Sequence, residues 1–131
     1  MSQENVEIVR RAHVEFERGN FWVPEFFDPD IHIVWLSAIG GDEETVGLAE
    51  MGRVVLDWMR SWDDLRLFAE RIVDAGDQVA VNGYWRGRGR ASGVVTDWRH
   101  GSVWTMRDDK AISVVSYSDP AEALKAAGVV E

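Results

Sequence analysis

The sequence contains no cysteine among its 131 residues. This absence excludes disulfide bonds, catalysis by a thiol and metal sites with cysteine ligands. Histidine is scarce as well: His13, His32 and His100 are the three present, and their spacing is neither HxH nor HxxxH. Because metal sites are normally built from such clusters of ligands, we expect no metal ion, and we expect no other cofactor.

Positive charge is in deficit, with 14 Lys and Arg residues against 23 Asp and Glu residues and a net charge of −9. Nucleic acids and anionic membrane surfaces both attract basic faces of proteins. The charge balance therefore argues against both as partners.

Long apolar runs are missing too. No segment approaches the ~18 apolar residues that a membrane helix needs. The N-terminal segment MSQENVEIVRR is polar and amphipathic, without the apolar core of a signal peptide. We therefore expect a cytoplasmic protein.

Tryptophan, by contrast, is abundant, with seven residues. In the segment TDWRHGSVWTMRDDK at 96–110, Trp98, His100, Ser102 and Trp104 occupy alternate positions. Alternate residues of a strand point to one face. A core face would be aliphatic and a solvent face charged, whereas this mixture is typical of the lining of a ligand cavity.

Hydrophobic spacing and turn residues predict one α+β domain over residues 1–131. Ser2 is a possible N-cap, Gly19 ends the first helix, and Asp119 with Pro120 begins the last. DPD at 28–30 predicts a turn, and 38–47 predicts a loop whose GGDEET segment could form a lid. The pattern places helices at 2–18, 48–62 and 120–127, and strands at 31–36, 63–74, 78–90, 94–107 and 110–118.

Several segments in this order resemble the nuclear transport factor 2-like superfamily, and its SnoaL-like members in particular. They are MSQENVEIVRRAHVEFERGN, FFDPDI, RGRGRASGV, VWTMRDDK and YSDPAEALKAAGV. The resemblance implies a cone-shaped fold in which a strongly bent antiparallel sheet wraps around N-terminal helices and encloses a pocket. It also implies a homodimer packed through the outer face of the sheet. Members include isomerases, cyclases, dehydratases, epoxide hydrolases and non-catalytic binders, so the fold alone does not give the function.

The catalytic groups of known members are missing here. The resemblance places the carboxylate base of ketosteroid isomerases at Trp35, their tyrosine at Ala12 and their protonated aspartate at Ser102. His100 could act as the histidine of a SnoaL-type cyclase, but Asp97 lies on the opposite face by alternation. The Asp–Arg–Asp set of limonene epoxide hydrolases has no clear counterpart.

Histidine is the natural acid or base near neutral pH. His100 is therefore the first catalytic candidate, with a half-exposed residue at the sheet rim as the alternative. His13 is the second, with a hydrogen-bonded core residue as the alternative. His32 alternates with Val34 and is expected on the outer face.

Aromatic and polar residues around these histidines are candidates for binding a substrate, with plain core packing as the alternative. By alternation, Trp85 points away from Tyr84, and we expect it outside the pocket. The RGRGR segment at 86–90 could bind an anion, or its glycines could serve as bulges. Whether Asp57 or Glu70 turns inward is open. The substrate-binding candidates are Trp35, Trp58, Tyr84, Arg86, Trp98, Ser102 and Trp104.

Two functions remain open. The first is a cofactor-free enzyme of the lyase, isomerase or cyclase type that acts on a small apolar organic substrate by general acid/base chemistry. The second is a non-catalytic domain that binds a small hydrophobic ligand. The histidine on the expected pocket face favours the enzyme, and the missing carboxylates favour the binder.

Overall fold

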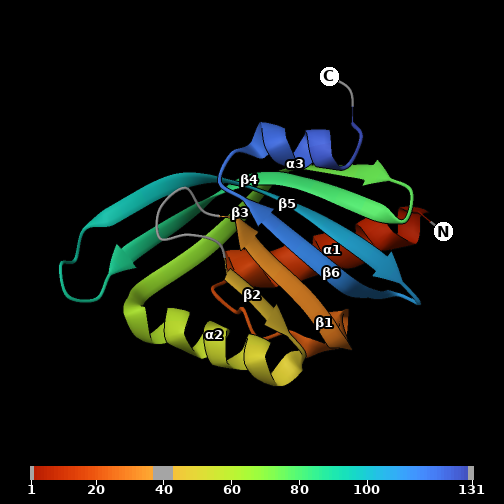
Figure 1. Ribbon diagram of the computed structural model, residues 1–131. Coiled ribbons are helices and arrows are strands. Elements are labelled where there is room, and N and C mark those ends of the chain that lie inside the picture. The colour runs from red at the N-terminus through yellow and green to blue at the C-terminus, as the bar shows by residue number, and fades with distance from the viewer. Residues whose placement is uncertain (1, 37–42, 130–131) are drawn as a thin grey trace.

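The computed structural model describes residues 2–36 and 43–129 (Figure 1). The helices are α1 (Ser2–Glu17), α2 (Leu48–Ser61), α3 (Pro120–Ala126) and the short 3-10 helix η1 (Pro24–Phe26). The strands are β1 (Phe27–Leu36), β2 (Glu43–Val46), β3 (Trp62–Ala75), β4 (Gln78–Gly89), β5 (Val95–Arg107) and β6 (Lys110–Tyr117).

In the described part of the chain, six strands form one sheet in the order β2-β1-β6-β5-β4-β3. β1 and β6 pair in parallel, and the other neighbours are antiparallel. The sheet is curved and does not close into a barrel, as Figure 1 shows. The predicted α+β class with a bent sheet is therefore confirmed.

The helices cover the sheet on both sides. α1 packs against β3 and β4 on the concave face, and α2 contacts β1, β2 and β3. α3 packs against β4 and β5 on the other face. Gly101 alternates with His100 and Ser102 along β5 and therefore points to this other face. A Cβ atom on Gly101 would lie 2.8 Å from the Ala123 Cβ atom of α3. The concave face therefore remains for α1, α2 and the core.

Local sequence explains where these helices lie. In α1, Val9, Ala12, His13 and Phe16 are all buried, which matches one face of a helix. The helix ends at Glu17, and Gly19 follows with a φ of +89° that favours glycine. At the other end of the chain, the Asp119 carboxylate accepts a hydrogen bond from the Ala121 amide, as expected for an N-cap.

Two segments differ from the prediction. Residues 28–30, predicted as a turn, lie within β1, where the Asp30 amide donates to the Asp28 carboxylate and the register with β6 shifts. The turn chemistry thus makes an irregularity in the strand rather than an end. Residues 43–46, predicted as loop, form β2 and pair with β1. Residues 37–42, which include much of the candidate lid, lie outside the described residues.

Among the helices of the described residues, none is long and apolar enough to cross a membrane.

β3 and β4 approach each other closely at Gly83, beside a register shift of the kind that bends a strand. The register between β3 and β4 shifts between Ala69 and Arg71, and a Cβ at Gly83 would lie 1.9 Å from the Phe68 carbonyl oxygen.

We expect Gly83→Ala to lower the free energy of unfolding by about 2–3 kcal/mol, because the backbone must move. Gly76→Ala is the control: it meets no atom within 4 Å and carries only the strain of its φ of +83°, about 1 kcal/mol. Urea unfolding measures the free energy of unfolding of both variants. Equal losses of stability in the two variants would contradict the close approach of the backbone at Gly83.

Candidate functional site

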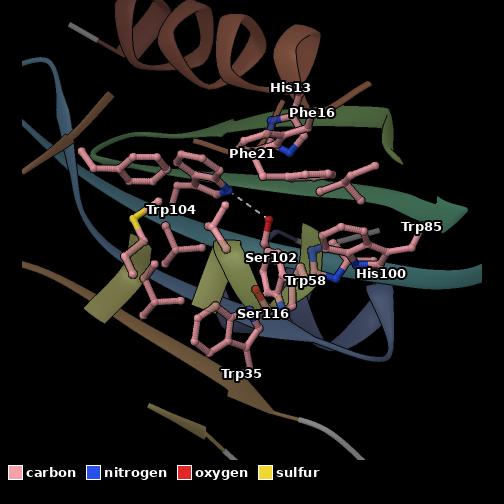
Figure 2. Close-up of a pocket in the computed structure, with 16 residues that line it drawn as sticks. His13, Phe16, Phe21, Trp35, Trp58, Trp85, His100, Ser102, Trp104 and Ser116 are labelled. Atoms are coloured by element: carbon pink, nitrogen blue, oxygen red, sulfur yellow. Dashed lines mark hydrogen bonds between the residues drawn. The ribbon is translucent and has the colours of Figure 1, made fainter. Parts of the chain in front are cut away.

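A cavity lies between the concave face of the sheet, α1 and α2 (Figure 2). Its volume is about 70 Å³, where one water needs on the order of 10–15 Å³. The cavity can therefore hold several non-hydrogen atoms. The lining residues are His13, Phe16, Phe21, Phe27, Ile33, Trp35, Met51, Val55, Trp58, Leu67, Trp85, His100, Ser102, Trp104, Val114 and Ser116.

The register of the sheet gathers the polar residues of this lining. Ser102 of β5 pairs with Ser116 of β6, and His100 pairs with Gly83 of β4. Residues directly opposite in an antiparallel pair share a face. The two serines and His100 are therefore neighbours on the concave face, as Figure 2 shows.

Tryptophans form one side of the cavity. Trp58 of α2 makes edge-to-face contacts with Trp35 and Trp85, at ring-centroid distances of 5.7 and 5.6 Å. Such pairs add roughly 0.5–1.5 kcal/mol each beyond the area they bury. Because these three rings are only partly buried, they mark the more accessible part of the wall.

The opposite end is closed by a second aromatic group. Trp104 stacks on Phe27 at 5.5 Å and contacts Phe16 at 6.3 Å. Its indole N–H donates a 3.0 Å hydrogen bond to the Ser102 hydroxyl oxygen, drawn as the dashed line in Figure 2. Since Ser102 accepts from Trp104, its own hydroxyl proton remains available to donate.

His13 reaches the cavity from α1 and is 4% exposed. Its Nδ1 atom lies 2.8 Å from the Val9 carbonyl oxygen one turn earlier in the helix. Its Nε2 atom is buried and has no hydrogen-bond partner among the residues that the structure describes. Burial lowers the pKa of His13 to about 4, and the bond to Val9 opposes this only in part. The ring is therefore neutral near pH 7.

His100 is buried beside the tryptophan wall. Its ring makes an edge-to-face contact with Trp85 at 5.4 Å. Burial, and to a smaller extent the electrostatic influence of His13, lower the pKa of His100 to about 3. His100 is therefore neutral near pH 7 too, and a proton on one imidazole disfavours a proton on the other.

Charge is absent from the cavity wall. Among the described residues that line it, sixteen in all, there is no Asp, Glu, Lys or Arg. In the same part of the chain, no three His, Cys, Asp or Glu residues gather to hold a metal ion. The wall can thus offer packing, indole faces, two hydroxyls and two neutral imidazoles.

Six of the candidate residues meet in this cavity: His13, His100, Trp35, Trp58, Ser102 and Trp104. Their distribution over α1, α2, β1 and β5 shows how the bent sheet brings distant segments together. Their roles in ligand binding or catalysis stay predictions.

The structure corrects the placement of Tyr84 and Arg86. Tyr84 pairs with Arg99 and stacks on Phe68 at 5.0 Å, on the face away from His100. Arg86 is exposed and binds the Asp97 carboxylate with its Nε atom at 2.8 Å, and this contact raises the pKa of Arg86 and lowers that of Asp97. Neither residue lines the cavity.

Trp98 and Trp85 also differ from expectation. Trp98 lies on the correct face of β5, but it is 37% exposed and does not line the cavity. It stacks instead on Trp62 and on Trp85, its cross-strand partner. Trp85, which was expected outside the pocket, lines it. Pairing Trp98 with Trp85 across the turn between β4 and β5 would have revealed this.

Other residues considered from the sequence lie away from the cavity. His32 binds Glu44 at 2.7 Å on the exposed side of β1. Arg90 of the RGRGR segment donates to the carbonyl oxygens of Met59 and Trp62. Asp57 and Glu70 are exposed and do not line the cavity. Ser116, which the sequence analysis missed, does line it.

Comparison with known proteins gives the family. The sequence matches the model of the SnoaL-like domain over residues 9–114. The chain therefore belongs to the SnoaL-like domain family. A comparison with curated proteins gives no match.

Three solved structures show the same fold at low sequence identity. A nuclear transport factor 2-like protein of unknown function from Burkholderia pseudomallei is 19% identical with a TM-score of 0.78, covering 93% of this chain and 95% of its own. A candidate SnoaL-like polyketide cyclase from Jannaschia sp. is 18% identical with a TM-score of 0.76, covering 99% and 95%. AclR, a candidate hydroxylase from Streptomyces galilaeus, is 15% identical with a TM-score of 0.75, covering all of both chains.

The buried histidines predict how stability depends on pH. Their pKa values in the folded protein lie below the ordinary 6.5, so below about pH 6.5 the unfolded chain binds more protons than the folded chain. The stabilisation is complete above about pH 6.5 and is lost as the pH falls toward about 4. We expect the free energy of unfolding to fall there by up to about 1.4 kcal/mol per pH unit for each histidine.

The measurement is urea unfolding between about pH 7 and pH 5, where most carboxylates stay ionised. The matched control is the double variant His13→Leu/His100→Leu, which keeps every acidic residue. Its stability should depend less on pH than that of the wild type. Parallel pH profiles would show that the imidazoles are not held neutral.

Proposed function

We propose that this protein binds a small, uncharged, mainly aromatic molecule in the cavity. The observation that supports this best is the composition of the wall: seven of its sixteen residues are Phe or Trp, and none carries a fixed charge. Ligand sites typically combine an apolar wall with a few placed polar groups. Here those polar groups are Ser102, Ser116, His13 and His100.

The restriction to uncharged molecules follows from desolvation. A carboxylate or ammonium group loses its hydration on entering an apolar cavity and needs an opposite charge or several hydrogen bonds in return. The cavity offers no fixed charge, and both histidines are neutral near pH 7 because burial lowers their pKa values. A charged ligand would therefore lose its hydration without gaining an opposite charge in the cavity.

The preference for aromatic molecules follows from the tryptophan wall. Trp58 stands edge-on to both Trp35 and Trp85, with interplanar angles of 78° and 77°. Perpendicular rings present both faces and edges to the space between them. A planar aromatic ligand can therefore stack on one ring and meet the edge of another.

A second candidate is a cofactor-independent enzyme, of the isomerase, cyclase, dehydratase or epoxide hydrolase type. It is favoured by two buried imidazoles in one cavity and by a fold that commonly hosts polyketide cyclases and isomerases. In this proposal His100 acts as the general base or acid and His13 supports it. The pKa values are about 3 for His100 and about 4 for His13. Proton transfer to or from these imidazoles would therefore depend on charge that develops on the substrate.

Binding is tested with neighbouring residues on opposite faces of β4. Trp85→Ala should weaken the affinity for phenol, a neutral planar probe, by about tenfold or more, because it removes one ring of the wall. Tyr84→Ala is the matched control and should change the affinity by less than about twofold. Isothermal titration calorimetry measures both. Similar losses in the two variants would place the ligand outside the cavity.

Catalysis is tested by turnover. Ketones, epoxides and polyketide-like compounds are screened with the wild type, and any substrate found is then given to His100→Ala. We expect kcat to fall by about 100-fold or more with loss of the pH–rate dependence, since general acid/base catalysis contributes that much. Unchanged turnover would remove His100 from the mechanism. If ligands bind and none is turned over, the binding function stands and the catalytic function fails.

A further inference from the structure

We infer that His13 presents a fixed hydrogen-bond acceptor to the cavity, so that the preferred ligand is an aromatic alcohol, a phenol or enol, that donates its hydroxyl proton to Nε2. This inference rests on the proposed binding function and specifies the chemical class of the ligand.

The tautomer of His13 follows from its partner in α1. The Val9 carbonyl oxygen, 2.8 Å from Nδ1, can only accept a hydrogen bond. Nδ1 must therefore carry a proton. A neutral imidazole carries one N–H, and His13 is neutral near pH 7, so Nε2 holds a lone pair. The helix backbone thus fixes the direction of the hydrogen bond that the other nitrogen can make.

No described residue of the surrounding wall satisfies this lone pair. Nε2 is buried without a partner, and the rings packed against His13 are Phe16 at 5.0 Å and Trp104 at 5.5 Å. Phe16 has no donor, and the indole N–H of Trp104 is already bound to Ser102. A buried acceptor without a donor is costly, and a ligand that supplies the donor removes this cost.

The rest of the wall narrows the choice of donor. Ammonium and guanidinium groups are excluded by the lack of charged partners, and a carboxylate has no proton to give near pH 7. A neutral hydroxyl on an aromatic or enol carbon satisfies Nε2 and also matches the tryptophan wall. The free hydroxyl proton of Ser102 can then donate to a second oxygen of the ligand.

The experiment compares phenol with anisole, which keeps the ring and oxygen but has no donor; both are single-ring compounds suited to a cavity of about 70 Å³. With the wild type we expect phenol to bind about five- to tenfold more tightly, as one net hydrogen bond provides. In His13→Leu the ratio of the two affinities should fall to near one. In His32→Leu, the matched histidine control on the exposed side of β1 and outside the cavity lining, the ratio should remain that of the wild type.

A spectroscopic measurement on the wild type makes the test independent of the variants. Two-bond ¹H–¹⁵N correlation spectra of the imidazole should show Nε2 of His13 as unprotonated in the free protein. Phenol should shift this nitrogen signal, and anisole should leave it nearly unchanged.

The outcomes separate the two proposals. Equal binding of the two compounds to the wild type, a ratio that survives in His13→Leu, or a protonated Nε2 would overturn the role of His13 and leave the binding function standing. If neither compound binds, the proposed binding function itself fails, and this inference fails with it.

Discussion

The pairing of β4 with β5 is the constraint on which the cavity depends. It runs through eleven residue pairs, from Gln78↔Thr105 to Arg88↔Val95, without a register shift. This pairing puts Trp85, His100, Ser102 and Trp104 on the concave face. A slip of one residue would exchange the faces of a whole strand and turn His100 to the side of α3. The close packing of Gly101 against Ala123 and Pro120 opposes such a slip, because any other side chain there would collide with α3.

The same burial that closes the cavity sets its electrostatics. Trp104, Phe27 and Phe16 exclude water at one end, and the loss of hydration keeps His13 and His100 in their neutral forms. A neutral imidazole gives one donor and one acceptor rather than a charge. Packing and polarity are therefore linked in this cavity. Burial by the aromatic wall sets the protonation state of the His13 and His100 imidazoles, and this state determines which ligands they can recognise.

Much of this was predictable from the sequence, and the failures have one cause. Helical spacing and alternation predicted the helices, the long strands and the positions of His13, Trp35, His100, Ser102 and Trp104. The period of each element predicted its type and which residues share a face, and the resemblance to the superfamily indicated which face of the strand meets the pocket. Tyr84, Arg86 and Trp85 were assigned to the wrong faces because the relative register of two strands depends on the turn that joins them, here at residues 90–94. The continuation of β1 through the local turn at 28–30 and the short strand β2 also depend on pairing with neighbouring strands, which no local pattern contains.

The positions where the superfamily resemblance implies catalytic groups are occupied here by groups that pack. Trp35 contacts Trp58, Ala12 is fully buried, and Ser102 binds the indole of Trp104. The polar chemistry has moved to His13 and His100, on elements that face the same space. No carboxylate among the described lining residues could hold an imidazolium, and burial already lowers the pKa values of both histidines. Two neutral imidazoles favour recognition of a neutral ligand over proton abstraction.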